Sequence, residues 1–116
     1  VDSTTAYQGY GRGFDRTLLR QLNTLACGGC LPAMTFLMDL PVSEGLQRAR
    51  FRWGETETAD HFEAESVAFH ERVREGFLAI ARAEPQRVHI LDATRPKEQV
   101  HQDILAALQR VIFHVA

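Results

Sequence analysis

Apolar positions spaced three, four and seven residues apart predict four helices along the chain. The first is predicted over residues 15–28, with Asp15 as its N-cap and the Gly28-Gly29 pair at its end, because glycine adopts the left-handed C-cap conformation without steric cost. Pro85 is expected to end the third helix, and Pro96 to open the fourth at a first-turn position where no hydrogen bond is lost. The second, third and fourth helices are predicted over residues 41–53, 59–84 and 96–114.

One face of each helix is expected to be buried, since an amphipathic helix packs its apolar stripe against the core. The second helix has the weakest stripe, which runs through Leu46 and Ala49. The expected core positions of the others are Leu18, Leu19, Leu22, Leu25 and Ala26 on the first helix, Phe62, Phe69, Val73, Phe77 and Ile80 on the third, and Val100, Ile104, Leu108, Val111 and Val115 on the fourth.

Two short apolar runs without clean alternation predict strands at residues 33–40 and 87–92. Runs of this kind suit strands that are buried on both faces, as in a parallel sheet. The order helix, strand, helix, loop, helix, strand, helix therefore predicts an α/β fold that is rich in helix and has two short parallel strands. Because a sheet of this type normally has about 4–6 strands, we expect the chain to be the C-terminal half of a larger α/β domain.

Two polar stretches that contain glycine are predicted to be loops, at residues 1–14 and 53–59. Gly9, Gly11 and Gly13 fall within five residues of the first stretch and break any regular periodicity. The glycine pattern does not match a phosphate-binding loop, which needs Gly-x-x-x-x-Gly-Lys-[Ser/Thr].

The charge balance argues against a nucleic-acid-binding protein. The chain has 13 Lys and Arg against 15 Asp and Glu, for a formal net charge of −2, whereas such proteins carry a basic excess. No run of about 18 apolar residues predicts a membrane span, and residues 1–5 lack the features of a signal peptide. With two cysteines and no secreted disulfide framework, a cytoplasmic location is expected.

Both predicted strands end on an aspartate, Asp39 and Asp92. Ligands of open α/β sheets bind at the carboxyl ends of the strands, so these residues indicate where a site would lie. The alternative interpretation is that each aspartate caps the turn that follows.

Arg48, Arg50 and Arg52 form the densest basic cluster, immediately before the polar stretch at 53–59. Arginines at a helix end suit a lid that clamps phosphate, because the guanidinium fork fits phosphate oxygens. Arg48 and Arg52 would share a helix face while Arg50 points away. The pattern alone equally describes a solvated surface that compensates the helix dipole, which is the commoner case.

Two further patterns have simple structural explanations. Cys27 and Cys30 have the C-x-x-C spacing of redox and zinc sites, but they lie at a helix end and no second ligand pair accompanies them, so no metal site is predicted. The two thiols are interpreted as incidental to a glycine C-cap. His70 and Glu71 are interpreted as a surface pair rather than an acid–base dyad.

In sequence order, these segments resemble bacterial thymidylate kinase. DSTTAYQGYGRG at residues 2–13 resembles that family's nucleoside-monophosphate segment, and FLMDLPV followed by GLQRAR, at residues 36–50, resembles its fourth strand and the helix before its lid. DHFEAE and FHERVR, within residues 60–74, resemble the helix after the lid. LDAT at residues 91–94, followed by Pro96, resembles the last strand and the final helix. The resemblance spans nearly the whole chain.

The resemblance implies the C-terminal half of a P-loop kinase, a three-layer α/β/α fold that transfers the γ-phosphoryl group of ATP to dTMP with Mg²⁺ and forms a homodimer. Residues 1–14 would be the dTMP-pocket loop and residues 53–59 the lid loop. In the pocket, Thr4 would contact the thymine edge, Tyr7 would lie over the deoxyribose and discriminate against a 2′-hydroxyl, and Gln8 would belong to the same wall.

The resemblance also implies that Phe62 and Glu63 close the sugar side of the pocket. The three arginines of the cluster would act at the lid, where arginines neutralise charge on the transferring phosphoryl group. His61 stands where the family usually has arginine. The family's phosphate loop, its Mg²⁺ ligands and its Asp-Arg segment would precede Val1. The alternative function is a non-catalytic α/β binding or interaction module derived from the kinase fold.

Overall fold

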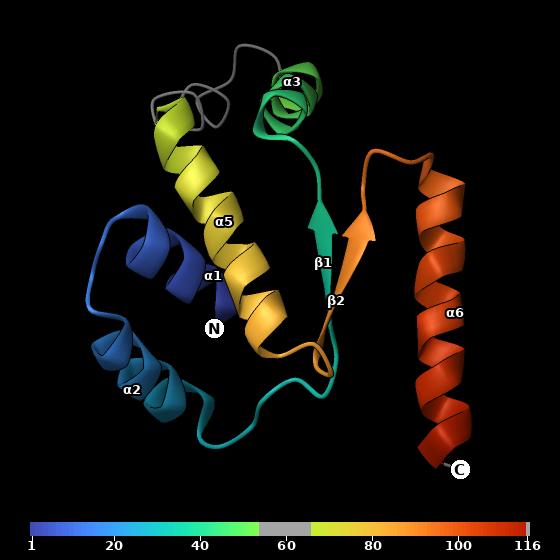
Figure 1. The fold of residues 1–116 in the computed structure, drawn as a ribbon, viewed down its shortest axis with the longest axis horizontal. Coiled ribbons are helices and arrows are strands. Elements are labelled where there is room, and N and C mark those ends of the chain that lie inside the picture. The colour runs from blue at the N-terminus through green and yellow to red at the C-terminus, as the bar shows by residue number, and fades with distance from the viewer. Residues whose placement is uncertain (54–65, 116) are drawn as a thin grey trace.

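The computed structural model describes residues 1–53 and 66–115, which form a two-stranded sheet between two long helices (Figure 1). Helix α5 (Val67–Ala83) packs on one side of the strands and helix α6 (Lys97–Val115) on the other. The strands are β1 (Thr35–Asp39) and β2 (Val88–Asp92), and the remaining elements are α1 (Asp2–Thr4), the π-helix η1 (Thr5–Gly11), α2 (Arg16–Cys27) and α3 (Val42–Trp53). This arrangement confirms the predicted helix-rich α/β fold.

Strands β1 and β2 are parallel, with Thr35 opposite Val88 and Asp39 opposite Asp92. Backbone hydrogen bonding continues past the carboxyl ends of the two strands. The backbone N–H of Ala93 donates to the carbonyl of Asp39 at 2.8 Å, so the loop that follows β2 is tied to the last residue of β1. The two aspartates at the carboxyl ends therefore lie side by side, as the sequence predicts.

The best-packed part of the core lies between η1 and α5. Ala6, Phe69 and Val73 are almost fully buried there, and Tyr7 and Phe77 pack around them. The expected stripe of α5 is thus confirmed where the structure describes it. Phe62, the first expected member of that stripe, lies outside the described residues.

Two glycines allow η1 to approach α5 closely. A Cβ atom at Gly76 would stand 2.7 Å from Cβ of Tyr10, and one at Gly11 would stand 2.8 Å from the ring of Phe69. Contacts this short exclude any larger residue unless the helices separate. The prediction of a loop over residues 1–14 is therefore wrong, because most of this stretch is helical and Gly9 and Gly11 serve close helix packing. Of the three glycines in this stretch, only Gly13 has a positive φ, as in a turn.

The ends of the other helices follow local capping chemistry. The Asp15 side chain accepts the backbone N–H of Thr17 at 2.9 Å, and Gly28 has the left-handed conformation with its N–H bonded to the carbonyl of Thr24. Helix α5 begins at Val67 rather than at residue 59, because Ser66 is its extended N-cap and accepts a hydrogen bond from the N–H of Phe69. The part of the predicted helix and lid loop between residues 54 and 65 lies outside the described residues.

The apolar face of α2 differs from the prediction. Leu19 is buried, but Leu18, Leu22 and Leu25 are exposed, because no other element of the described chain covers that side of the helix. On α6, Val100 is buried as expected, while Val111 is exposed. None of the helices that the structure describes is long and apolar enough to cross a membrane.

Candidate functional site

A cavity of about 500 Å³ opens at the carboxyl ends of the two strands. Its wall combines Tyr7 from η1, Asp39 from β1, Arg48 and Arg52 from α3, and Arg74 from α5. These residues are separated by up to 67 positions in the sequence, and the fold brings them together at the edge of the sheet where ligands of α/β proteins bind. This cavity is the candidate site.

The ring of Tyr7 is held in place by aromatic neighbours. Its centroid lies 6.1 Å from that of Phe69 and 6.2 Å from that of Phe77, and the second pair is edge-to-face. Such pairs favour one ring orientation. Tyr7 therefore forms a fixed aromatic part of the cavity wall. The structure does not place Thr4 or Gln8 among the lining residues, and the Thr4 side chain is exposed.

Helix α3 places two members of the arginine cluster on the cavity. Arg48 donates to the Glu44 carboxylate at 2.7 Å and to the carbonyl of Ala93 at 3.0 Å. Arg52, one turn later, lines the same cavity, whereas Arg50 does not. This separation follows from helical geometry, because residues four apart share a face.

Arg74 and Asp39 form an ion pair that sequence reasoning missed. Nε and Nη2 of Arg74 donate to Oδ1 and Oδ2 of Asp39 at 2.9 and 3.1 Å. The bond to Asp39 raises the pKa of the Arg74 guanidinium above its usual value. No local sequence signal could have found the pair, because its two residues are 35 positions apart.

The second strand-end aspartate behaves differently. Asp92 accepts hydrogen bonds from the hydroxyl and the backbone N–H of Thr94, and these bonds lower the pKa of its carboxyl group. The capping interpretation therefore holds for Asp92, while Asp39 belongs to the cavity.

His70 corrects another prediction. It is buried rather than exposed, its ring stands edge-on to Phe69 at 5.5 Å, and it lines the cavity together with Tyr7. Glu71, its predicted surface partner, is exposed. The difference arises because His70 lies on the cavity side of α5, one position from the buried stripe.

The structure does not describe three of the predicted site residues. His61, Phe62 and Glu63 lie outside the described residues. Within residues 1–53 and 66–115, no three His, Cys, Asp or Glu side chains gather where they could hold a metal ion. Cys27 and Cys30 are free thiols at the glycine turn that ends α2, where the N–H of Cys30 donates to the carbonyl of Cys27 at 3.0 Å.

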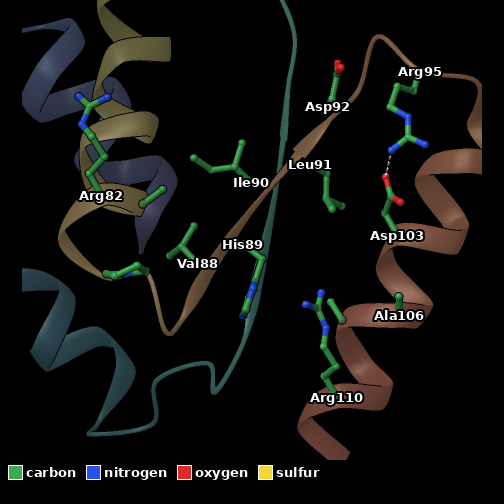
Figure 2. A pocket seen from close by; sticks show the side chains of 13 residues that line it. Arg82, Val88, His89, Ile90, Leu91, Asp92, Arg95, Asp103, Ala106 and Arg110 are labelled. Atoms are coloured by element: carbon green, nitrogen blue, oxygen red, sulfur yellow. Dashed lines mark hydrogen bonds and ion pairs between the residues drawn. The ribbon is translucent and has the colours of Figure 1, made fainter.

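A second cavity, of about 620 Å³, lies along β2 between α5 and α6 (Figure 2). Figure 2 shows Arg82 on the α5 side and Arg110 on the α6 side, with Arg95 paired to Asp103 at 2.5 Å. Asp92, one of the two strand-end aspartates, lines this cavity. Of the described residues that the family resemblance assigns to the dTMP pocket or the lid, none lines it.

Comparison with known proteins adds to this geometry. The family model described as thymidylate kinase matches residues 1–104. The chain is 47% identical over 115 residues to the thymidylate kinase of Nitratidesulfovibrio vulgaris, covering 97% of this chain and 54% of that protein. It is 50% identical over 112 residues to the thymidylate kinase of Desulfovibrio desulfuricans, covering 94% and 52%.

The fold is likewise similar to a solved one. The crystal structure of thymidylate kinase from Ehrlichia chaffeensis matches with a TM-score of 0.62 and 33% identity, over 93% of this chain and 44% of that chain. The chain thus spans about half the length of the curated relatives it matches. Sequence, fold and the order of the segments agree, and the chain belongs to the thymidylate kinase family.

Proposed function

We propose that the complete protein transfers the γ-phosphoryl group of ATP to dTMP, and that this chain supplies the dTMP pocket and the arginines beside it. One observation carries the proposal: a single cavity at the carboxyl ends of the strands holds Tyr7 together with Arg48 and Arg52. An aromatic wall suits a nucleoside, and guanidinium groups suit its phosphate.

In this proposal, some of the site residues bind dTMP and others act on the transferring phosphoryl group. Tyr7 packs against the deoxyribose and disfavours a 2′-hydroxyl, Thr4 contacts the thymine edge, and Gln8 belongs to the same pocket wall. Phe62 and Glu63 close its sugar side. Phosphoryl transfer depends mainly on positioning and on stabilising charge. The arginines of α3, Arg48, Arg50 and Arg52, provide that charge.

ATP and Mg²⁺ belong to the proposal, but no step is assigned to the metal on this chain. The only lysine of the sequence is Lys97, so the Gly-x-x-x-x-Gly-Lys-[Ser/Thr] loop that cradles ATP phosphates does not occur in these 116 residues. The described residues also offer no cluster of metal ligands. We propose that the residues that bind the ATP phosphates and the Mg²⁺ ligands belong to the remainder of the complete protein.

A homodimer and a cytoplasmic location are also proposed. The exposed leucines of α2 support a further packing partner, because an apolar stripe of this kind is unfavourable in water. Light scattering on the complete protein tests the dimer, and a monomeric mass would reject it.

Nucleotide turnover tests the function. The complete protein should convert dTMP and ATP to dTDP and ADP, and the 116-residue chain alone should not, because it lacks the loop that holds the ATP phosphates. dTMP binding without turnover by the complete protein would favour the non-catalytic binding module. Turnover by the purified chain, with its mass verified, would contradict the division of labour proposed here.

A further inference from the structure

The ion pair between Arg74 and Asp39 joins α5 to the end of β1 at the wall of the candidate site. Two nearly parallel hydrogen bonds, at 2.9 and 3.1 Å, connect the guanidinium edge to both carboxylate oxygens. The side chains keep 32% and 20% of their surface exposed. A fork-to-fork pair of this kind fixes the mutual orientation of its partners, which a lysine could not do.

Hydrogen bonds continue from this pair to the arginine cluster. The carbonyl of Asp39 accepts the N–H of Ala93 at 2.8 Å, and the carbonyl of Ala93 accepts Nη1 of Arg48 at 3.0 Å. Arg48 is held from its other side by Glu44, four residues earlier on α3. A single path of hydrogen bonds therefore connects α5, the end of β1, the loop after β2, and α3.

Stability alone is a weak reason for such an arrangement. Ion pairs that remain partly exposed contribute little to folding, because the attraction between the charges is offset by desolvation and by the ordering of long side chains. Orientation is a stronger reason, since a guanidinium displaced by about 1 Å loses much of its effect on a reacting group.

We propose that Arg74 and Asp39 are positioning residues of the nucleotide site, which set the location of the Arg48 guanidinium through Ala93. This inference rests on the proposed kinase function. Arg74 does not itself neutralise the phosphate in this account, because the Asp39 carboxylate already balances its charge. Arg48 acts on the nucleotide, and the pair determines where it does so.

Kinetics of the complete protein test this role. Arg74→Ala should lower kcat/KM for dTMP about tenfold, which corresponds to about 1.4 kcal/mol. The loss should appear mainly in kcat, because Arg48 acts on the transferring group. Arg74→Lys should recover only part of it, and Asp39→Asn, which leaves the backbone carbonyl in place, should resemble Arg74→Ala. Arg82→Ala is the matched control, since Arg82 is also on α5 but has only a 3.9 Å contact with Glu75 between exposed side chains.

A double-mutant cycle separates positioning from a general structural lesion. In an Arg48→Ala background, Arg74→Ala should cost less than about twofold, because the group that it positions is already gone. A full tenfold loss in that background would overturn the proposal, and so would an Arg74→Ala variant as active as Arg82→Ala. If Arg74→Ala does not fold, Arg74→Lys and Asp39→Asn carry the same cycle.

Hydrogen exchange provides a readout that does not depend on activity. The amides of α3 should exchange faster in Arg74→Ala than in the parent or in Arg82→Ala, because the path that anchors Arg48 is broken. Unchanged exchange in α3 would reject the inference even if the parent protein phosphorylates dTMP. A parent without dTMP turnover would instead reject the proposed function, while the exchange result still decides whether the pair anchors α3.

Discussion

The strand-end cavity and the cavity along β2 each have three arginines in their walls, yet they differ in how those arginines are arranged. At the strand ends, Arg48 is anchored to the backbone of the loop after β2, and Arg74 is anchored to the carboxylate of Asp39 at the end of β1. Along β2, Arg95 pairs with Asp103 of α6, and Arg82 and Arg110 come from helices on opposite sides (Figure 2). The second cavity is also the larger, at about 620 against 500 Å³.

Neither cavity volume nor the number of arginines therefore identifies the site. The strand-end cavity is distinguished by a fixed aromatic wall and by two arginines, Arg48 and Arg74, whose positions are set by bonds at the carboxyl end of the sheet. Preorganised charge of this kind is what stabilises a transition state, because no further ordering is needed when charge develops. The following predictions test whether this difference between the two cavities determines which of them binds the nucleotide.

The largest effect is expected for the α3 arginines. In the complete protein, Arg48→Ala and Arg52→Ala should each lower kcat by at least about 100-fold, since an arginine that acts on the transferring phosphoryl group contributes roughly 10³–10⁵-fold in rate. KM for dTMP should rise less, because these charges act chiefly on the transition state. Steady-state kinetics measure both constants.

Arg110→Ala, in the groove along β2, is the control for these two variants and should retain the activity of the parent. If kcat is unchanged in both α3 variants, the cluster is a solvated surface and the comparison between the cavities fails.

Tyr7→Ala should narrow the preference for dTMP over its ribonucleotide counterpart. A buried hydroxyl without a partner costs about 1–3 kcal/mol, or roughly tenfold to over a hundredfold in affinity. Thr4→Val should instead lower kcat/KM for both nucleotides by a similar factor, since it removes a bond to the base. The measurement is the ratio of kcat/KM for dTMP to kcat/KM for its ribonucleotide counterpart. If this ratio is the same in Tyr7→Ala and in the parent, Tyr7 does not contact the sugar.

Gly76→Ala should destabilise the wall that holds Tyr7. The new Cβ would meet Tyr10 at 2.7 Å, and overpacking of this kind costs about 1–3 kcal/mol. Urea unfolding followed by circular dichroism measures the loss. Because alanine favours a helix more than glycine does, a Gly76→Ala variant as stable as the parent or more stable would show that η1 and α5 can separate without cost.

The smallest effect is expected far from the site, at the salt bridge between Glu84 and Arg87. The bond from Arg87 lowers the pKa of the Glu84 carboxyl. Its contribution to stability should be present above the pKa of the unfolded state and be lost as pH falls through the lower folded value. Because Glu84 is half exposed, Glu84→Gln should change the free energy of unfolding by less than about 1 kcal/mol.

Unfolding midpoints at neutral and acidic pH, for the parent and for Glu84→Gln, measure this contribution. The two proteins should converge as the pH falls, whereas a difference that grows toward low pH would contradict the sign. dTMP turnover at neutral pH should not change, which separates this region from the strand-end cavity.

Local patterns predicted those parts of the molecule that local physics determines. The two strands, their parallel order and the shared edge of Asp39 and Asp92 follow from apolar runs and from the geometry of α/β sheets. Asp15 and Gly28 acted as caps for the same reason, since capping involves only neighbouring residues.

The features that the sequence did not predict depend on contacts between distant segments. Gly9 and Gly11 look like turn residues in the sequence, but close packing between η1 and α5 requires Gly11 and keeps the segment helical. The Arg74–Asp39 pair joins positions 35 apart, so no local pattern could indicate it. Leu18, Leu22 and Leu25 of α2 were expected in a core that the described residues do not provide.

Amide chemical-shift mapping of the complete protein with dTMP compares the two cavities most directly. The largest shifts should occur at Tyr7, His70 and Arg74, together with the turn between β1 and α3, and they should saturate with dTMP concentration. Arg82 and Arg110 should hardly respond. Saturable shifts that centre on Arg82 and Arg110, with Tyr7 unaffected, would contradict the assignment of the strand-end cavity as the nucleotide site.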